Sequence, residues 1–295
     1  MIEKKSTIII SKILANGLLI IAAASCIIPF LTVLSSSFSN EAEIIEKGYS
    51  IFPRGFSIEA YKSVFANIET IVKAYMVTIL TTAAGALLST LITAMAGYPL
   101  SRGDYQWKKF FNFYIYFTMI FSGGAIASYL WITQGLHLRD NPLVLILPLL
   151  GSGYNIFLMR TYMSKIPGEL VEAAKIDGAS EFKILFSIIM PMSTVGLATI
   201  FLMTALTYWN QWYASLMYFN TDAYTTLQYY LIRVMNNIEE ILSNKNSMVV
   251  QDASKMPGET ARMAMCVVSA GPMIFVFAFF QKYFVSGIAV GSVKG

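Results

Sequence analysis

Polar side chains that could hold a small molecule lie inside or beside the most apolar parts of this sequence. They are uncharged hydroxyl and amide groups and flat aromatic rings, with a glycine among them: Ser122, Gly124, Tyr154, Asn155, Asn210 and Trp212. Hydroxyl and amide groups hydrogen-bond and aromatic faces stack, which suits a neutral, hydroxyl-rich solute such as a sugar. We therefore treat them as a candidate substrate pathway. Interfacial aromatic belts use the same tyrosines and tryptophans, and helix packing uses the same glycines, so that alternative stays open.

A polar stretch between two apolar segments carries a different kind of signal. Pro167 suits the first turn of a helix, and Glu169 and Glu172 suit its positive N-terminal end. Gly178 is placed for a left-handed C-cap. These residues predict a short helix from Pro167 to Asp177.

One face of this short helix is small and smooth. Its residues recur at i, i+3, i+4 and i+7: Leu170, Ala173, Ala174 and Asp177. Such a face could lie in a groove of another protein. The alternative is a solvated amphipathic hairpin, because helices rich in glutamate and alanine are common.

A second helix is predicted directly after the glycine turn. Ser180 can cap its start, and an apolar stripe follows: Phe182, Leu185, Phe186 and Ile189. Residues 162–187 are therefore predicted to form a helix, a sharp turn and the start of a second helix that re-enters a membrane.

Several kinds of chemistry lack the residues they need. No Asp, Glu, Lys, Arg or His lies centrally in any long apolar segment, which disfavours proton-coupled carriers and intramembrane enzymes but leaves sodium coupling open. There is no G-x-x-x-x-G-K-[ST] loop, so ATP hydrolysis would need another polypeptide. His137 is the only histidine, in a predicted solvated loop, and one histidine cannot form a metal cage. The net charge of +4 is not clustered, so nucleic-acid binding has no support.

The elements that must position these residues are membrane helices. At 56% hydrophobic and 13% charged, the chain is far more apolar than a soluble domain. We expect an all-α, polytopic protein with a single transmembrane domain over residues 1–295. Six spans are predicted, at about 13–34, 74–97, 110–132, 142–161, 188–209 and 263–281.

The N-terminal apolar run imitates a lipoprotein signal that ends at Cys26. The run continues past this cysteine to Leu34, which is long enough to cross a bilayer, so we predict a retained span. Cys26 and Cys266 lie in apolar runs and resemble neither a disulfide framework nor a metal site. We interpret both as packing residues.

Charge predicts the orientation of the spans. The two termini and the loops 98–109 and 160–187 hold twelve Lys/Arg against six Asp/Glu, whereas the other side holds nine against eleven. By the positive-inside rule, both termini and the polar loop 162–187 face the cytoplasm. The external loop 210–260 carries a helical apolar stripe, which suggests a folded scoop: Leu227, Tyr230, Leu231, Val234, Ile238 and Ile241.

The polar loop resembles a known family motif. It reads Glu172-Ala173-Ala174, three residues, Gly178, nine residues, Ile188, one residue, then Met190-Pro191. This resembles the EAA loop of permease subunits in bacterial ABC importers, with Met190 where the family usually has leucine. The resemblance implies the type I ABC importer permease fold, with a coupling helix that docks on an ATPase through Glu172, Ala173, Ala174, Asp177 and Gly178.

Other passages resemble the carbohydrate branch of these importers, close to the second permease of maltose-type systems and closer to permeases for complex saccharides. They are FSGG from Phe121, WNQWY from Trp209, Leu227-Gln228, and the ending from Gln281. The resemblance implies a bacterial cytoplasmic membrane location and a heteromeric importer of an oligosaccharide or complex saccharide. The implied partners are a second permease, two ATPases that bind ATP and magnesium, and an external solute-binding protein, with no cofactor in this chain.

Two rival classes stay open from the residues alone. An ABC importer of peptides, amino acids or osmolytes would share the loop around Glu172 but need not share FSGG and WNQWY. In a channel or a sodium-coupled carrier, which works without nucleotide, that loop would have no function.

Overall fold

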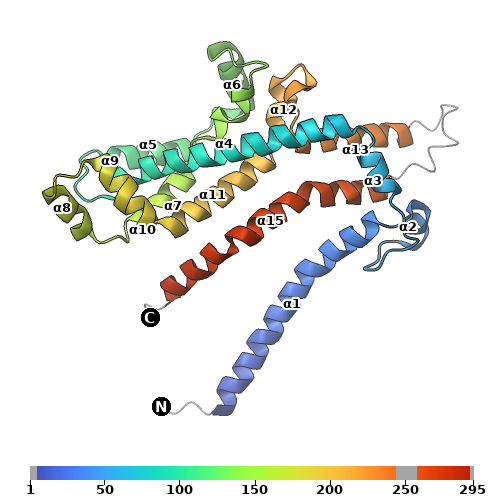
Figure 1. The fold of residues 1–295 in the computed structure, drawn as a ribbon, viewed down its shortest axis with the longest axis horizontal. Helices are drawn as coiled ribbons and strands as arrows, with labels where there is room; N and C mark the ends of the chain where they lie inside the picture. Colours follow the sequence, from blue (N-terminus) through green and yellow to red (C-terminus); the bar gives the residue numbers. More distant parts are fainter. Residues whose placement is uncertain (1–4, 244–257, 293–295) are drawn as a thin grey trace. The chain divides into compact units, whose positions relative to one another are not determined.

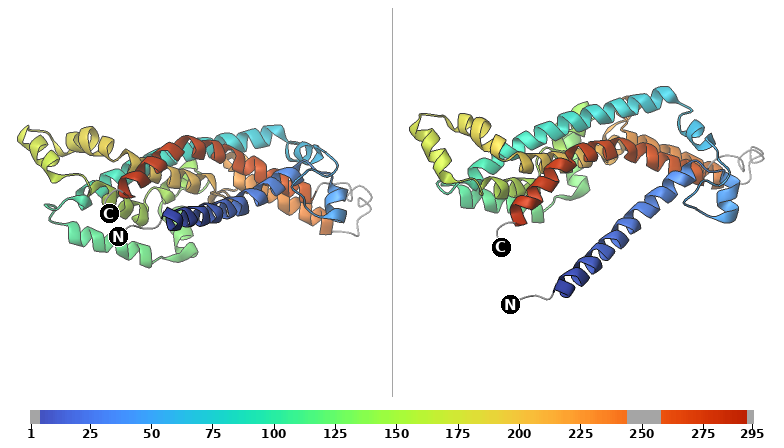
Figure 2. Two further views of the ribbon diagram at one scale, coloured as in Figure 1. Left: turned by 90° about the horizontal axis from the view of Figure 1, so that it is seen from below. Right: turned by 60° about the horizontal axis from the view of Figure 1, so that its bottom comes forward.

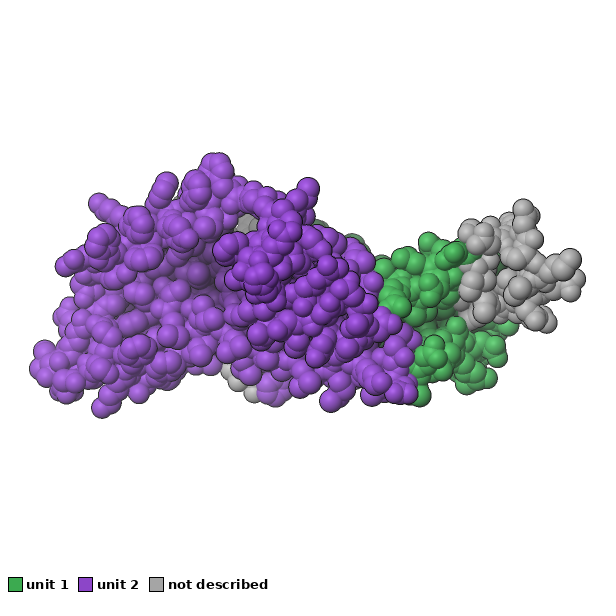
Figure 3. Space-filling model, turned by 90° about the horizontal axis from the view of Figure 1, so that it is seen from above, with its two compact units in different colours: residues 1–68, 231–271 green, residues 69–230, 272–295 purple. Residues whose placement is uncertain are grey.

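The computed structural model describes residues 5–243 and 258–292. All regular secondary structure over these ranges is helical. The chain forms two compact units, shown in green and purple in Figure 3. Unit 1 comprises Met1–Ile68 and Leu231–Gly271, and unit 2 comprises Glu69–Tyr230 and Pro272–Gly295. The all-α prediction is confirmed.

Three helices are each long and apolar enough to cross a membrane without a break (Figure 1). They are α1 (Lys5–Ser37), α4 (Ile68–Ser101) and α15 (Glu259–Ser292). The apolar parts of these helices are Lys12–Ser37, Ile68–Ser101 and Glu259–Gln281. They contain the first, second and sixth predicted spans, 13–34, 74–97 and 263–281.

The other three predicted spans are each bent in the structure. α5 (Lys108–Ile120) meets α6 (Gly124–Leu130) and its π-helical extension to Gly135 at 109°. The bend falls on the FSGG passage, where Gly124 has a φ of 79°, a left-handed value that glycine adopts without strain.

The remaining two bends occur at prolines and short irregular turns. The two 3₁₀ turns Pro142–Leu145 and Leu147–Leu149 lead at 52° into α7 (Gly153–Met163). The second bend, of 84°, separates Glu181–Met192 from α11 (Thr194–Trp209). The segment before it consists of α9 (Glu181–Ile184), a π-helical turn (Leu185–Ile189) and α10 (Met190–Met192).

Unit 2 is built on close packing of α4, α7 and α11. A Cβ added at Gly85 of α4 would lie 2.5 Å from the ring of Tyr208 in α11, so glycine is needed for the helices to approach this closely. The Tyr208 hydroxyl donates to the Ile146 carbonyl at 2.8 Å, and the Ser89 hydroxyl donates to the Leu150 carbonyl at 2.9 Å. The Ile146 carbonyl also accepts from the Leu149 N–H at 3.2 Å, and the Ser89 hydroxyl satisfies the Leu150 carbonyl, so both backbone groups of the irregular segment before α7 are paired, as an apolar environment requires.

The predicted external stripe is confirmed as a helix, α13 (Leu227–Ser243), which follows α12 (Tyr213–Tyr218). The side chains of Leu227, Tyr230 and Leu231 are buried. Val234 and Ile238 are half-buried, and the Ile241 side chain lies outside the described residues.

Unit 1 contains the short helices α2 (Glu41–Lys47) and α3 (Glu59–Val64) and the first residues of α15. The Glu41 carboxylate accepts hydrogen bonds from the backbone N–H groups of Glu259 and Thr260 at 2.8 and 2.9 Å, and from the Thr260 hydroxyl at 2.6 Å. A side chain from α2 thus caps the start of α15. We call these residues and their ion-pair neighbours, Glu239 and Arg262, the capping cluster.

Two smaller predictions have different outcomes. His137 is exposed, in a loop, as expected. The interpretation of Cys26 and Cys266 as packing residues is wrong for the chain by itself, because both are exposed. In a membrane protein an apolar segment need not point its cysteines inward, since lipid can also cover them.

Candidate functional site

The polar stretch forms the short helix that its sequence predicts. α8 spans Gly168–Ile176, with Pro167 directly before it and Asp177 directly after it. Gly178 has a φ of 75°. The N–H of Ala179 donates to the carbonyl of Ala174 at 2.9 Å, which is the 6→1 bond of a Schellman motif. Ser180 then caps α9, its hydroxyl accepting from the N–H of Lys183 at 3.4 Å.

α8 has one inward and one outward face. Val171 is buried and Ala174 packs against the same core, so Ala174 belongs to the inward face rather than the smooth outer one. Leu170, Ala173 and Asp177 are exposed, as are Glu169 and Glu172. Ile176, which sequence reasoning did not single out, is 87% exposed and is the most prominent apolar group on α8.

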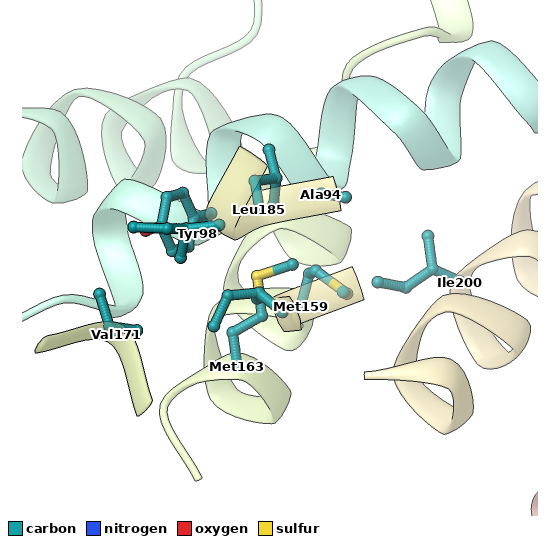
Figure 4. Close-up of a cluster of buried hydrophobic side chains, with 9 residues drawn as sticks. Ala94, Tyr98, Met159, Met163, Val171, Leu185 and Ile200 are labelled. Atoms are coloured by element: carbon teal, nitrogen blue, oxygen red, sulfur yellow. The ribbon is translucent and has the colours of Figure 1, made fainter. Parts of the chain in front are cut away.

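The inward face joins α8 to four other helices. Val171 enters a cluster of buried side chains that comes from α4, α7, the α9 segment with its π-helical turn, and α11 (Figure 4). The cluster consists of Ala94, Tyr98, Met159, Met163, Val171, Ile184, Leu185, Ile189 and Ile200. α8, α9 and α10 gather at the end of unit 2 where α4 ends (Figures 1 and 2). A displacement of α8 would therefore act on the ends of several spans at once, because packed interiors transmit strain.

Only half of the apolar stripe that was predicted on the second helix is buried. Leu185 and Ile189 are buried in the cluster, but Phe182 and Phe186 are exposed. Ile184, outside the predicted stripe, is fully buried. The π-helical turn over Leu185–Ile189 shifts the register on which the i, i+3, i+4 pattern depends.

An ion-pair network supports α8 from the other side. We call it the polar latch: Tyr98, Arg102, Asp104, Lys175 and Glu181. Arg102 holds Asp104 through two hydrogen bonds of 2.8 and 2.5 Å, and its guanidinium lies 3.4 Å from Glu181. Lys175 of α8 lies 2.9 Å from Glu181 and 3.4 Å from Asp104. The Tyr98 hydroxyl donates to Glu181 at 2.6 Å.

The latch joins the end of α4 to two successive helices, α8 and α9, which lie 71 to 79 residues further along the chain. Arg102 and Asp104 follow α4, Lys175 lies in α8 and Glu181 begins α9. The two hydrogen bonds from Arg102 hold the pKa of the Asp104 carboxyl well below its usual range. The hydrogen bond to Glu181 raises the pKa of Lys175. Both groups therefore remain ionised near neutral pH.

A hollow of about 390 Å³ lies between α8 and the loop after α4. Arg102, Glu172 and Lys175 line it on its polar side, and Met163 and Val171 line it on its apolar side. Together with the exposed Ile176, this makes a surface of mixed character, suited to receive a protein partner rather than a small ion.

The candidate pathway residues lie at separate places. The Ser122 hydroxyl accepts from the Gly124 N–H at 3.2 Å in the α5–α6 bend. The Asn210 amide donates to the Leu206 carbonyl at 2.9 Å at the end of α11. Trp212 is 41% exposed and Tyr154 is 55% exposed.

Asn155 differs from the other pathway residues because it is buried. Its amide donates to the Thr204 hydroxyl of α11 at 3.4 Å, so it links α7 to α11. In the described parts of the chain, the Ser122–Gly124 contact is the one hydrogen bond that joins two of the six candidates.

Sequence reasoning missed the polar latch. Opposite charges in the two loops 98–109 and 160–187 were the available signal, but charge alone does not pair Arg102 with Glu181, 79 residues away. The same holds for the hollow, because its lining comes from α4, α7, α8, the connections beside them and the π-helical turn over Leu185–Ile189.

The apolar helices and the exposed outer face of α8 are those expected of a membrane permease. A family model described as "Binding-protein-dependent transport system inner membrane component" matches residues 89–290. The chain belongs to this family, and it is a permease subunit of a binding-protein-dependent importer in the membrane. This match, together with the same fold in a solved chain of a bacterial ABC transporter, confirms the resemblance to ABC importer permeases and the type I fold.

Individual relatives cover almost the whole chain. The polygalacturonan/rhamnogalacturonan transport system permease protein YtcP of Bacillus subtilis is 34% identical over 285 residues, 96% of this chain and 97% of that protein. Protein LplC of Bacillus subtilis is 34% identical over 272 residues, 92% of this chain and 90% of the relative.

A solved structure has the same fold. It is a chain of a bacterial ABC transporter involved in the import of the acidic polysaccharide alginate. The TM-score is 0.77 at 28% identity, and the match covers 96% of this chain and 99% of the other.

Proposed function

We propose that this permease imports an oligosaccharide or a piece of a complex saccharide, delivered by an external solute-binding protein, by alternating access. The similarity to a permease for polygalacturonan and rhamnogalacturonan, and to an importer of alginate, supports a saccharide as the solute. The absence of charged residues from the central parts of the predicted spans supports recognition by hydrogen bonds and aromatic faces within this chain.

The observation that carries the proposal is the attachment of α8. Its outer face, with Ile176 and Glu172, is exposed, while its inner face is fixed to the ends of α4, α7, α9 and α11. A helix held in this way can receive a push from a partner and pass it to the spans. We assign the partner as one of two ATPase subunits, which bind ATP and magnesium and supply the energy.

In this mechanism α8 biases one shared equilibrium between inward-open and outward-open states. Closure of the ATPases on ATP would move α8, and the buried cluster would carry the movement to the spans. The second permease would complete the translocation path, since the pathway candidates of this chain lie at separate places. Glu172, Ala173, Asp177 and Gly178 keep their proposed coupling roles, whereas Ala174 acts from the inner face.

The proposed orientation places both termini and α8 in the cytoplasm. The excess of Lys and Arg on that side supports it. Cysteine substitution of Asp177, exposed beside α8, tests it in intact cells. We expect no labelling by an impermeant reagent, and labelling from outside would reverse the orientation.

Reconstituted transport tests the solute class. The assembled importer is placed in vesicles with its binding protein and ATP, and uptake of labelled oligogalacturonate, neutral oligosaccharide and a short peptide is compared. We expect saturable, ATP-dependent uptake of a saccharide. Uptake of the peptide alone would assign the permease to another substrate class, and uptake without ATP would contradict the ATP-driven mechanism.

A further inference from the structure

An exposed apolar loop in unit 1 is not used by the coupling mechanism. Residues 48–58, between α2 and α3, present five large apolar side chains, each 45% or more exposed: Tyr49, Ile51, Phe52, Phe56 and Ile58. We call this segment the aromatic loop. Phe52 is 78% exposed and Phe56 is 74% exposed, which is costly in water for side chains of this size.

The aromatic loop is held in a defined conformation. Its Arg54 N–H donates to the Ser39 hydroxyl at 3.1 Å, and its Arg54 carbonyl accepts from the Asn40 N–H at 2.9 Å. The Arg54 guanidinium also donates to the Lys47 carbonyl. The exposure of the aromatic side chains is therefore built into the folded loop.

The same bonds place the loop at the end of a membrane span. The Ser57 N–H donates to the carbonyl of Phe38 at 2.9 Å, and the Phe56 ring stacks on the Phe38 ring with centroids 6.0 Å apart. Phe38 directly follows Lys12–Ser37, the apolar part of α1. A helix of 26 residues is about 39 Å long, which exceeds the roughly 30 Å hydrocarbon core, so its end reaches the headgroup layer.

The loop has the composition of a membrane-interface segment. Aromatic side chains concentrate at headgroup level, where their apolar bodies leave water while polar neighbours stay hydrated. Lys47, exposed and paired with Glu43 at 3.3 Å, precedes the apolar residues, and the half-buried Arg54 lies among them, so both cations are placed near the level of lipid phosphates. A phospholipid surface therefore fits both the position and the chemistry of the patch.

We propose that the aromatic loop is an interfacial anchor that inserts Phe52 and Phe56 into the headgroup and acyl boundary of the leaflet at the C-terminal end of α1. In the proposed orientation this is the outer leaflet. The anchor would hold the α1–α4 connection against the bilayer while α8 moves. It depends on α1 spanning the membrane and not on the identity of the solute.

Spin labelling of the assembled importer in phospholipid vesicles tests the anchor. Cys26 and Cys266 are replaced by alanine, which their exposure permits, and single cysteines are placed by Phe52→Cys and Ile58→Cys. Glu46→Cys and Lys62→Cys, exposed and polar on α2 and α3, are the matched controls. Collision of each label with oxygen, which partitions into lipid, is compared with collision with a water-soluble nickel chelate.

We expect the ratio of oxygen to nickel collisions to exceed unity at positions 52 and 58 and to fall below unity at both controls. Two labelled positions keep the test valid if one variant fails to assemble. Dominant nickel access at positions 52 and 58 would place the loop in water and overturn the proposal. Loss of both kinds of collision would mean that the partner permease or the binding protein covers the patch, which would overturn it as well.

Discussion

The polar latch of unit 2 and the capping cluster of unit 1 use carboxylates in different ways. In the latch, Asp104 and Glu181 bind the long side chains of Arg102 and Lys175. In the capping cluster, Glu41 binds two backbone N–H groups and a hydroxyl at the first residues of α15. Side-chain pairs can shift together with the elements that carry them, whereas a backbone cap fixes the start of one helix.

The surroundings reinforce this difference. The latch lies beside the hollow next to α8 and on the edge of a buried cluster drawn from five helical segments. The capping cluster joins short connections to α15, and Arg262 there pairs with Glu239 at 2.6 Å and Glu259 at 3.0 Å. We infer that the latch belongs to the moving part of the transport cycle and that the capping cluster maintains the resting structure. Four predictions test this division, from the largest expected effect to the smallest.

Gly178→Val should abolish uptake while the protein still inserts. Open space surrounds the position, so the cost comes from forcing a β-branched side chain into a φ of 75°, about 1–3 kcal/mol. This would misplace α8 relative to α9. Gly168→Val, also in open space but without a positive φ, is the matched control and should retain uptake. Normal uptake and normal ATPase co-purification with Gly178→Val would contradict the role of the turn.

Arg102→Met should uncouple ATP hydrolysis from uptake. It leaves Asp104 and Glu181 without their guanidinium partner, at a cost of roughly 1–3 kcal/mol because the Arg102 side chain is 15% exposed. We expect the number of solute molecules moved per ATP to fall, and Arg102→Lys to recover part of it. This stoichiometry distinguishes a positioning residue from a merely structural one. Reduced protein yield with unchanged stoichiometry would remove the latch from the coupling path.

Ile176→Ser should weaken ATPase binding without changing the stability of the permease alone. The side chain is 87% exposed, so its burial would come from the partner, worth up to roughly 1.5–3 kcal/mol. Leu170→Ser, 40% exposed on the same helix, should have a smaller effect. Retention of the ATPase subunits during purification measures both. Unchanged retention in both variants would remove the outer face of α8 from the contact.

Glu41→Gln should lower thermal stability with little change in coupling. The amide keeps one acceptor oxygen but loses the charge that strengthens its hydrogen bonds to the start of α15, at a cost of about 0.5–2 kcal/mol. Glu43→Gln, which affects an exposed pair with Lys47, is the control and should be close to neutral. Loss of coupling with Glu41→Gln would show that both clusters take part in the cycle.

The sequence by itself determined the local features of this protein. The limits of α8, the left-handed turn at Gly178 and the cap at Ser180 depend on residues within one or two helical turns, and each was predictable. The long apolar runs of α1, α4 and α15 were equally clear, because a span needs only length and composition. The prolines and the FSGG glycines lie at the bends of the three broken spans, but these residues do not predict the bend angles.

Only the tertiary structure decided which polar groups meet. Arg102 reaches Glu181, Asn155 meets Thr204, and Ala174 turns inward while Ile176 projects outward. Each outcome depends on segments tens of residues apart, brought together by the close packing of α4, α7 and α11. Periodicity identifies the faces of one helix but does not say which neighbour covers them, because burial in a membrane protein follows from packing against other helices as much as from hydrophobicity.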